Sequence, residues 1–186
     1  MTTPLHILGI SGSLRKQSLN SAALRAAQKL LPQGVTLEIF DLAPIPMYNG
    51  DLREEQGFPE PVQQLRAKIA AADAVLIVSP EYNYSVPGVL KNAIDWASRA
   101  PDQPFDGKPV AIMGASPGGL GTARMQYHLR QVFVYLNGML LNKPEVMISH
   151  AAAKIDAEGN LTDQATREHI EKMLQALVAW TVRLKK

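Results

Sequence analysis

The chain has 186 residues, 46% of them hydrophobic, which is ordinary for one soluble domain with a single core. Nineteen Lys and Arg residues nearly balance seventeen Asp and Glu residues, so the net charge of +2 gives no indication of a nucleic-acid-binding stripe. The absence of cysteine excludes disulfides, thiolate catalysis and cysteine-based metal sites. No apolar run reaches the roughly 18 residues that a membrane span needs. We therefore expect a single domain over residues 1–186, located in the cytoplasm.

Apolar runs alternate with helical patterns along the chain. Short Val- and Ile-rich runs bounded by Gly, Pro or Ser predict buried strands at Leu5–Ile10, Val35–Phe40, Ala74–Ser79, Pro109–Ala115 and Glu145–Ile148. Helical spacing of apolar residues predicts helices at Asn20–Leu31, Pro61–Ala72, Pro87–Ala100, Thr122–Leu136 and Thr162–Leu184. Thr162 is the expected N-cap of the last helix.

Strands that alternate with helices indicate an α/β fold, a mostly parallel sheet with helices on both faces. Right-handed crossovers then give a doubly wound three-layer sandwich, and five strands favour the flavodoxin-like order 2-1-3-4-5. The segment Asp41–Gly57 is a long connection after the second strand. Two interpretations of it stay open: it lines the mouth of a site, or it only bridges two elements.

The segment from Ser11 to Asn20 joins the first strand to the first helix. The N–H groups and the dipole of a helix start favour a bound phosphate. Ser11, Ser13 and Ser18 can add neutral hydrogen bonds. Arg15 can add a charge-assisted one. The segment matches neither G-x-x-x-x-G-K-[ST] nor G-x-G-x-x-G, which argues against nucleoside triphosphates and a Rossmann dinucleotide loop. A small phosphate monoester remains, with FMN as the leading candidate.

The loop after the third strand, Ser79–Gly88, holds Glu81, Tyr82 and Asn83 between two prolines. In open α/β sheets ligands bind beyond the carboxyl ends of the strands, so this loop is expected beside the first one. Its backbone N–H groups can bond the polar edge of a flat heterocycle, and Tyr82 can pack against the ring. A turn whose tyrosines only cover the core is the alternative.

The loop after the fourth strand, Ala115–Thr122, contains Ser116 and three glycines. Glycines let the backbone approach a ligand closely and leave space over one face of a ring. A turn that only needs flexibility is the alternative, because a glycine-rich loop alone is weak evidence.

No pattern identifies a general acid, a metal site or a nucleophilic triad. Each of the four histidines is interpreted as a structural or surface residue: His6, His128, His150 and His169. No two histidines have metal-ligand spacing, and Ser116 lacks the G-x-S-x-G context of a nucleophile elbow. We therefore expect no metal and no catalytic side chain, with the chemistry residing on the cofactor.

Three motifs in chain order together resemble the NAD(P)H-dependent FMN reductase family. They are Gly-Ser-Leu-Arg followed by Ser18 and Asn20, then Pro-Glu-Tyr-Asn with Pro-Gly-x-Leu-Lys-Asn-Ala-Ile-Asp-Trp, and then Ala-Ser-Pro-Gly-Gly-x-Gly. The resemblance runs from Ile7 to about Glu145. Within the family the chain looks most similar to bacterial quinone reductases that are also described as chromate reductases.

The resemblance implies a flavodoxin-like fold, tightly bound FMN and a homodimer or homotetramer. At the phosphate end of FMN it implies Ser11, Ser13, Arg15, Ser18 and Asn20, with Leu19 beside them. Around the isoalloxazine it implies Pro80, Glu81, Tyr82, Asn83, Ser116, Gly118 and Gly119. Arg124, Tyr127 and Glu145 resemble positions used in subunit contacts.

The helix predicted at Thr122–Leu136 carries more large apolar groups than one buried face requires. They are Met125, Tyr127, Leu129, Phe133 and Tyr135. This surplus favours a subunit interface on the helix, and core packing alone is the alternative.

These observations lead to the hypothesis of an FMN-dependent NAD(P)H oxidoreductase. NADPH or NADH would reduce the flavin by hydride transfer, and a quinone would accept the electrons in a ping-pong cycle. Chromate, nitro or azo compounds and free flavin are possible further acceptors. The alternatives are a flavodoxin-type electron carrier and an FMN-binding regulatory module without turnover. No loop offers an unambiguous site for the 2′-phosphate of NADPH; the candidates are Lys16, Arg53 and Arg124.

Overall fold

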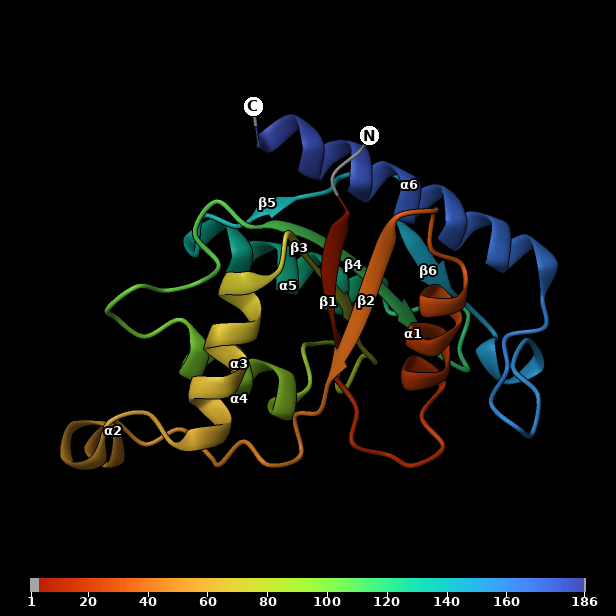
Figure 1. Cartoon of the computed structure of the whole chain (residues 1–186). Coiled ribbons are helices and arrows are strands. Elements are labelled where there is room, and N and C mark those ends of the chain that lie inside the picture. The colour runs from red at the N-terminus through yellow and green to blue at the C-terminus, as the bar shows by residue number, and fades with distance from the viewer. Residues whose placement is uncertain (1–3, 186) are drawn as a thin grey trace.

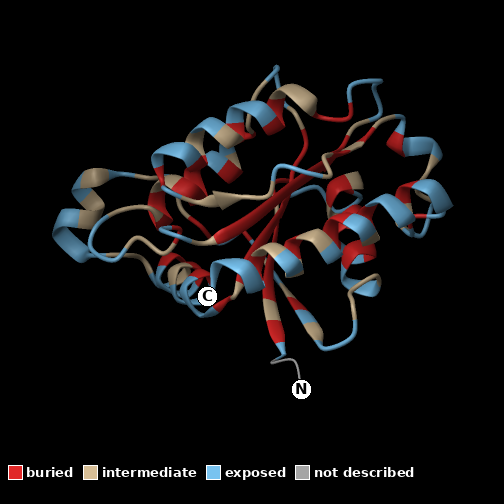
Figure 2. Ribbon diagram, turned by 90° about the horizontal axis from the view of Figure 1, so that it is seen from above, coloured by how far each residue is buried: buried red, intermediate tan, exposed pale blue. Residues whose placement is uncertain are grey.

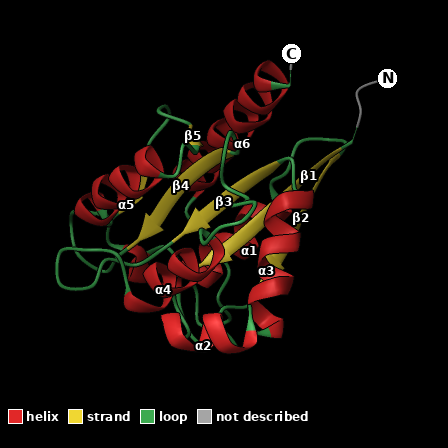
Figure 3. Ribbon diagram, turned by 90° about the vertical axis from the view of Figure 1, so that its left-hand side faces the viewer, coloured by secondary structure: helices red, strands yellow, loops and turns green. Residues whose placement is uncertain are grey.

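The computed structural model describes residues 4–185 and places a parallel sheet between two layers of helices (Figures 1 and 3). The strands are β1 (Leu5–Ser11), β2 (Val35–Phe40), β3 (Ala74–Val78), β4 (Pro109–Ala115), β5 (Met139–Leu140) and β6 (Val146–Ile148). They pair in the order β2-β1-β3-β4-β5, with β6 also paired to β4. The predicted order 2-1-3-4-5 and the three-layer α/β architecture are confirmed.

Two helical layers cover the two faces of this sheet. The helices are α1 (Leu19–Lys29), α2 (Gly50–Gln56), α3 (Glu60–Ala71), α4 (Gly88–Ala97), α5 (Ala123–Tyr135) and α6 (Gln164–Leu184), with a short 3₁₀ turn η1 (Ala151–Ala153). Side chains of α3, α4 and α5 share one hydrophobic cluster with the sheet, and those of α1 and α6 share the other. Within residues 4–185 no helix combines the length and the apolar character needed to cross a bilayer.

Strand β3 shows how the two cores are divided. All five of its residues are buried, and the central strands are buried along most of their length in Figure 2. Val75 and Ile77 point into the α3–α5 cluster, whereas Leu76 and Val78 point into the α1–α6 cluster. Successive residues of a strand face opposite sides, so a continuous apolar run is what a sheet covered on both faces requires.

Most predicted elements lie within three residues of the observed ones, and the fifth strand is the main correction. The strand predicted at Glu145–Ile148 is found as β6, which pairs with the last three residues of β4. A second strand, β5, pairs with Pro109 and Val110 at the beginning of β4 and was not predicted. Two residues are too few to show a hydrophobic period, so β5 leaves no sequence signal of its own.

The connection Asp41–Gly57 also differs from the prediction, because its second half is helix α2. The side chain of Asn49 caps this helix by accepting from the N–H of Asp51 (3.0 Å), and Gly57 ends it with a φ of +78°. The helix has no buried residue, so its sequence lacks the apolar periodicity from which a helix is predicted. The first half of the connection is held on α4, where Trp96 Nε1 donates to the carbonyl of Pro46 (2.9 Å).

The N-cap predicted for the last helix is one residue too early. Asp163 caps α6, and its carboxylate accepts from the backbone N–H of Thr166 (2.9 Å). The hydroxyl of Thr162 instead donates to the carbonyl of Lys154 (3.1 Å). Both residue types are good caps. Because the hydroxyl of Thr162 is bound to Lys154, Asp163 is the residue that caps the helix.

Candidate functional site

A cavity of about 310 Å³ opens where β1, β3 and β4 end, between the three loops that follow these strands. Its lining comprises Ser13, Arg15, Ser18, Leu19, Asn20, Pro80, Glu81, Tyr82, Ala115, Ser116 and Pro117. The structure thus brings most of the predicted cofactor residues together around one space. Four predicted residues lie outside this lining: Ser11, Asn83, Gly118 and Gly119.

The first loop ends in the N-terminus of α1, which supplies hydrogen-bond donors to the cavity. Ser18 is the N-cap, and its hydroxyl accepts from the N–H of Ser21 (3.2 Å). The N–H groups of Leu19 and Asn20 belong to the first turn, where a helix provides no acceptor of its own. Ser11 is turned toward the helix, since its hydroxyl lies 2.8 Å from that of Ser21. An anion in the cavity would therefore meet free backbone donors and a helix dipole.

The side chain of Asn20 joins the first loop to the end of β4. Its Nδ2 donates to the carbonyl of Ala115 (2.9 Å), and its Oδ1 accepts from the N–H of the same residue (2.8 Å). Asn20 is buried, with 3% of its surface exposed. The amide therefore fixes the distance between the first and third loops, and the backbone N–H of Asn20 is the group left for a phosphate.

The second loop contains a tight two-residue hairpin. Tyr82 and Ser85 exchange two backbone hydrogen bonds (3.1 and 3.0 Å). Asn83 and Tyr84 between them have φ values of +49° and +68°, as in a type I′ turn. This conformation is unfavourable for tyrosine, but the Arg124 guanidinium stacks 3.5 Å from the centre of the Tyr84 ring. The stacking holds the hairpin against α5, with Tyr82 at the cavity.

The carboxylate of Glu81 caps the N-terminus of α5. It accepts from the backbone N–H groups of Arg124 (3.1 Å) and Met125 (3.2 Å), and also from Arg124 Nε (2.5 Å). The side chain of Glu81 is only 8% exposed. Thr122, the N-cap residue by position, makes no side-chain cap of its own. Glu81 therefore contributes its backbone to the cavity wall while its side chain holds helix α5 in place.

The third loop is fastened to the segment that follows β6. Ser116 donates its N–H to Ile148 (3.0 Å) and accepts at its carbonyl from Ala151 (3.0 Å). The N–H of His150 donates to the carbonyl of Gly118 (3.1 Å). Gly118 and Gly119 are exposed, whereas Gly121 is buried, and a Cβ added to it would lie 2.6 Å from the backbone of Met147.

The lining of the cavity combines two kinds of group, and FMN needs both. The first loop supplies the hydroxyls of Ser13 and Ser18, the Arg15 guanidinium and the helix start, which together suit a phosphate. The second and third loops supply Pro80, Tyr82 and Ser116, which suit a ring system. The volume falls in the range of small-molecule sites. The residues present thus fit the group that the sequence predicts.

Comparison with known proteins identifies the family. The family model of NADPH-dependent FMN reductases matches residues 5–153. The chain belongs to this family. It is 57% identical over 185 residues to the NAD(P)H-dependent FMN reductase PA1204 of Pseudomonas aeruginosa, with all of both chains covered. It is 46% identical over 187 residues to the quinone reductase of Escherichia coli strain K12, again with full coverage of both.

A solved structure of the same fold is that of FerB, a flavoenzyme NAD(P)H:(acceptor) oxidoreductase from Paracoccus denitrificans. It superposes on this FMN reductase with a TM-score of 0.87 at 36% identity, over 96% of this chain and 98% of the other. The predicted family and the flavodoxin-like fold are therefore confirmed.

Two histidines of this FMN reductase, His128 and His169, contact other protein groups. His128 Nδ1 lies 3.1 Å from the Ser85 hydroxyl, and His169 Nε2 lies 2.7 Å from the carbonyl of Glu145. Between residues 4 and 185 no group of three His, Asp or Glu side chains has the geometry of a metal site.

Two structural roles in the site were not anticipated from the sequence. One is the cap that Glu81 forms on α5, where it binds Arg124, 43 positions along the chain. The other is the clamp that Asn20 forms on Ala115, 95 positions along the chain. Local pattern carries no information on such distant partners. The family motif does contain both residues, but it does not say that their side chains bind protein.

Proposed function

We propose that this protein is an FMN-dependent NAD(P)H:quinone oxidoreductase. The proposal depends on one observation above all, a single cavity lined both by groups that suit a phosphate, from the first loop, and by groups that suit a flat ring, from the second and third loops. Family membership supports FMN as the ligand. Full-length relatives that are named quinone reductases support a quinone as the electron acceptor. A cytoplasmic location is part of the proposal, because cytoplasmic metabolism supplies reduced nicotinamide nucleotides.

The chain's own residues bind and orient the reactants. Ser13, Arg15 and the first turn of α1 neutralise and position the phosphate. The hairpin at Tyr82 and the loop at Ser116 border the ring, and the exposure of this region leaves a face open to substrates. Bound FMN supplies the hydride-transfer chemistry that links NAD(P)H to the acceptor. A wall made of two flat side chains and an exposed loop does not select for one acceptor shape, so chromate, nitro and azo compounds and free flavin are proposed as further acceptors.

The proposal is tested by anaerobic visible spectra of the FMN-loaded protein. NADPH or NADH should bleach the flavin absorption, and a benzoquinone added afterwards should restore it. A flavin spectrum that neither nucleotide changes would favour an electron carrier or a regulatory module. Protein that stays colourless after addition of FMN would contradict the cofactor assignment itself.

Replacing Arg15 by alanine should weaken FMN binding roughly 10- to 100-fold. Hydrogen bonds to charged groups contribute about 1.5–3 kcal/mol, and a guanidinium–phosphate contact is of this kind. Titration of the FMN-free variant with FMN, followed by flavin fluorescence, measures the change in Kd. Arg183→Ala is the control, because Arg183 is an exposed arginine in the last turn of α6. Equal FMN affinity of Arg15→Ala and wild type would refute the phosphate assignment.

We further propose that the protein forms a homodimer or homotetramer through α5. Met125, Leu129 and Phe133 of this helix are buried in the core. Three other large side chains remain exposed, Tyr127 (52%), Val134 (76%) and Tyr135 (86%). Positions 127, 134 and 135 lie seven and eight residues apart and therefore share one helix face. Tyr127 also donates to Glu145 (3.1 Å), which places two of the predicted contact residues side by side.

Size-exclusion chromatography with light scattering tests this assembly. We expect a mass of two or four chains at micromolar concentration, and a smaller species for Val134→Lys, which puts a charge on the exposed face. A wild-type monomer would contradict the proposal and leave core packing as the reason for the apolar content of α5.

A further inference from the structure

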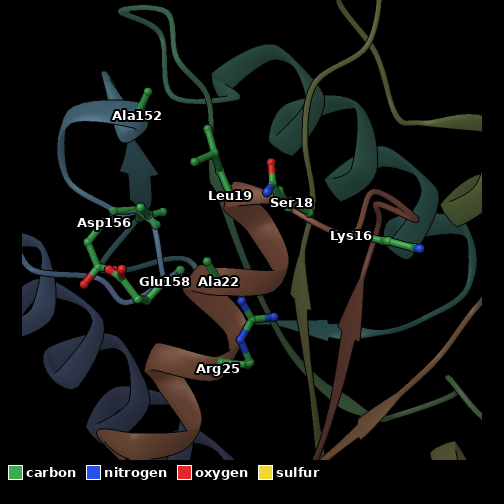
Figure 4. A pocket seen from close by; sticks show the side chains of 12 residues that line it. Lys16, Ser18, Leu19, Ala22, Arg25, Ala152, Asp156 and Glu158 are labelled. Atoms are coloured by element: carbon green, nitrogen blue, oxygen red, sulfur yellow. The ribbon is translucent and has the colours of Figure 1, made fainter.

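A second hollow of about 360 Å³ lies next to the flavin cavity, between α1 and the chain that follows η1. Ser18 and Leu19 line both spaces, so the two are neighbours across the N-terminus of α1. Figure 4 shows Ala22 and Arg25 of α1 on one side, with Asp156 and Glu158 on the other. The remaining lining residues are Lys16, Gln17, Ala152, Ile155, Ala157 and Gly159.

The hollow continues along α1 into a smaller one of about 100 Å³. Ala22, Arg25, Glu158 and Gly159 line both, and Lys29 and Arg167 are among the residues added by the smaller one. We call the two together the α1 groove. It therefore leads from the phosphate end of the flavin cavity along the outside of the helix.

Cationic side chains outnumber free carboxylates in the α1 groove. Its cations are Lys16, Arg25, Lys29 and Arg167, and its acids are Asp156 and Glu158. Asp156 is engaged in a turn, where its carboxylate accepts from the backbone N–H of Asn160 (2.7 Å). This hydrogen bond lowers the pKa of Asp156 and so favours the ionised carboxylate, which leaves four cations against two acids in the groove. The groove therefore offers a net positive surface to a ligand.

Arg25 is the cation best placed to meet a ligand. Lys29 and Arg167 are directed at protein acceptors, Asn160 Oδ1 (3.4 Å) and the carbonyl of Leu161 (3.3 Å). Within residues 4–185 the Arg25 guanidinium has no ion-pair partner. Its Nη2 reaches across the groove to Gly159, where an added Cβ would lie 3.0 Å away. Arg25 is also one of the four residues that line both hollows.

We propose that the α1 groove binds the adenosine half of NADPH and that Arg25 contacts the 2′-phosphate. This inference rests on the proposed function, in which the nicotinamide meets the open face of the flavin ring beside the hairpin at Tyr82 and the loop at Ser116. A dinucleotide that runs from there past Ser18 and Leu19 enters the groove. Small and apolar side chains, including Ala22, Ala152 and Ile155, border a space suited to a flat base.

The arrangement distinguishes Arg25 from the cations that the sequence indicated. Arg53 donates to the carbonyl of Ala100 (3.0 Å), and Arg124 is paired with Glu81. Lys16 lines the groove, but its amine points away from Asp156 and Glu158 in Figure 4. A guanidinium can hold a phosphate through two parallel hydrogen bonds. NADH carries a hydroxyl instead of a phosphate at the 2′ position, so it cannot form this pair of bonds. Arg25 therefore acts as a specificity residue that favours NADPH over NADH.

Binding of adenosine 2′,5′-bisphosphate to the FMN-loaded protein tests the inference without turnover. Isothermal titration should show that Arg25→Gln weakens this ligand about tenfold, since a charge-assisted contact is lost. Adenosine 5′-monophosphate, which lacks the 2′-phosphate, should bind both proteins alike. Arg183→Gln is the matched control, an exposed arginine at the far end of α6, and should bind like wild type. Equal affinity of wild type and Arg25→Gln for the bisphosphate would overturn the assignment.

Steady-state kinetics with a quinone provide the second measurement. The ratio of the KM for NADPH to the KM for NADH should rise about tenfold in Arg25→Gln, and Arg25→Lys should recover part of the difference. An unchanged ratio in an active enzyme would reject the role of Arg25 and leave the proposed function intact. Wild-type protein that oxidises neither nucleotide would reject the proposed function, while the bisphosphate titration would still decide whether the groove binds a 2′-phosphate.

Discussion

Replacing Asn20 by alanine is expected to lower the free energy of unfolding by about 2–6 kcal/mol. The substitution removes both partners of Ala115, whose N–H and carbonyl are buried at the end of β4. Each buried group left without a hydrogen bond costs about 1–3 kcal/mol. FMN binding should weaken as well, because the clamp sets the separation of the first and third loops. Asn20 would thus affect FMN binding by positioning the two loops that border the cofactor.

Urea unfolding of the FMN-free protein measures the first effect, and FMN titration measures the second. Gln28→Ala is the matched control on the same helix, since Gln28 Nε2 makes one partly buried hydrogen bond to the carbonyl of Leu37 (2.8 Å). The control should lose less stability than Asn20→Ala and should keep its FMN affinity. If Asn20→Ala were as stable as the control, the clamp would have no structural importance.

Replacing Glu81 by alanine should cost about 2–4 kcal/mol of stability, the second largest effect. The change removes the cap of α5 and leaves Arg124 without its carboxylate. Arg124 then stacks less firmly on Tyr84, which adopts a positive φ. We therefore expect the hairpin that carries Tyr82 to become mobile, in addition to the loss of stability.

Thermal unfolding and hydrogen exchange of the hairpin check this result. Glu60→Ala is the control: Glu60 also lies in the first turn of a helix, α3, but is exposed and bonded to Gln64 (3.0 Å) within the same helix. Glu81→Gln should fall between wild type and alanine, because the amide oxygen can still accept a hydrogen bond. Similar losses for Glu81→Ala and Glu60→Ala would show that the cap on α5 contributes little.

The sheet and the three loops were predictable because their signals are local. A run such as that of β3 is apolar at every position, and turn residues bound it on both sides. Parallel strands with helical crossovers must then end on one edge, which brings the loops after β1, β3 and β4 together. The cavity lined by residues from all three loops follows from this rule.

The parts that escaped prediction depend on contacts between distant residues or on weak local signals. Asn20 and Glu81 bind backbone groups far along the chain, and no pattern around either residue reveals this. Helix α2 lacks an apolar face, although the cap residues Asn49 and Gly57 that flank it were a usable signal. Arg25 is one polar residue on the outer face of α1, and only the fold shows that a hollow lies beside it.

The division of the fifth strand into β5 and β6 has a consequence for how copies of this chain can meet. The two strands span two and three residues and pair with opposite ends of β4, so that border of the sheet is interrupted. A long border of free N–H and carbonyl groups is the template on which chains add strands and fibrils grow. At the other border β2 carries Glu38, which pairs with Lys68 (2.8 Å), and charges also hinder such addition. Both borders of the sheet are thereby poor templates for strand addition, in line with the proposed association through α5.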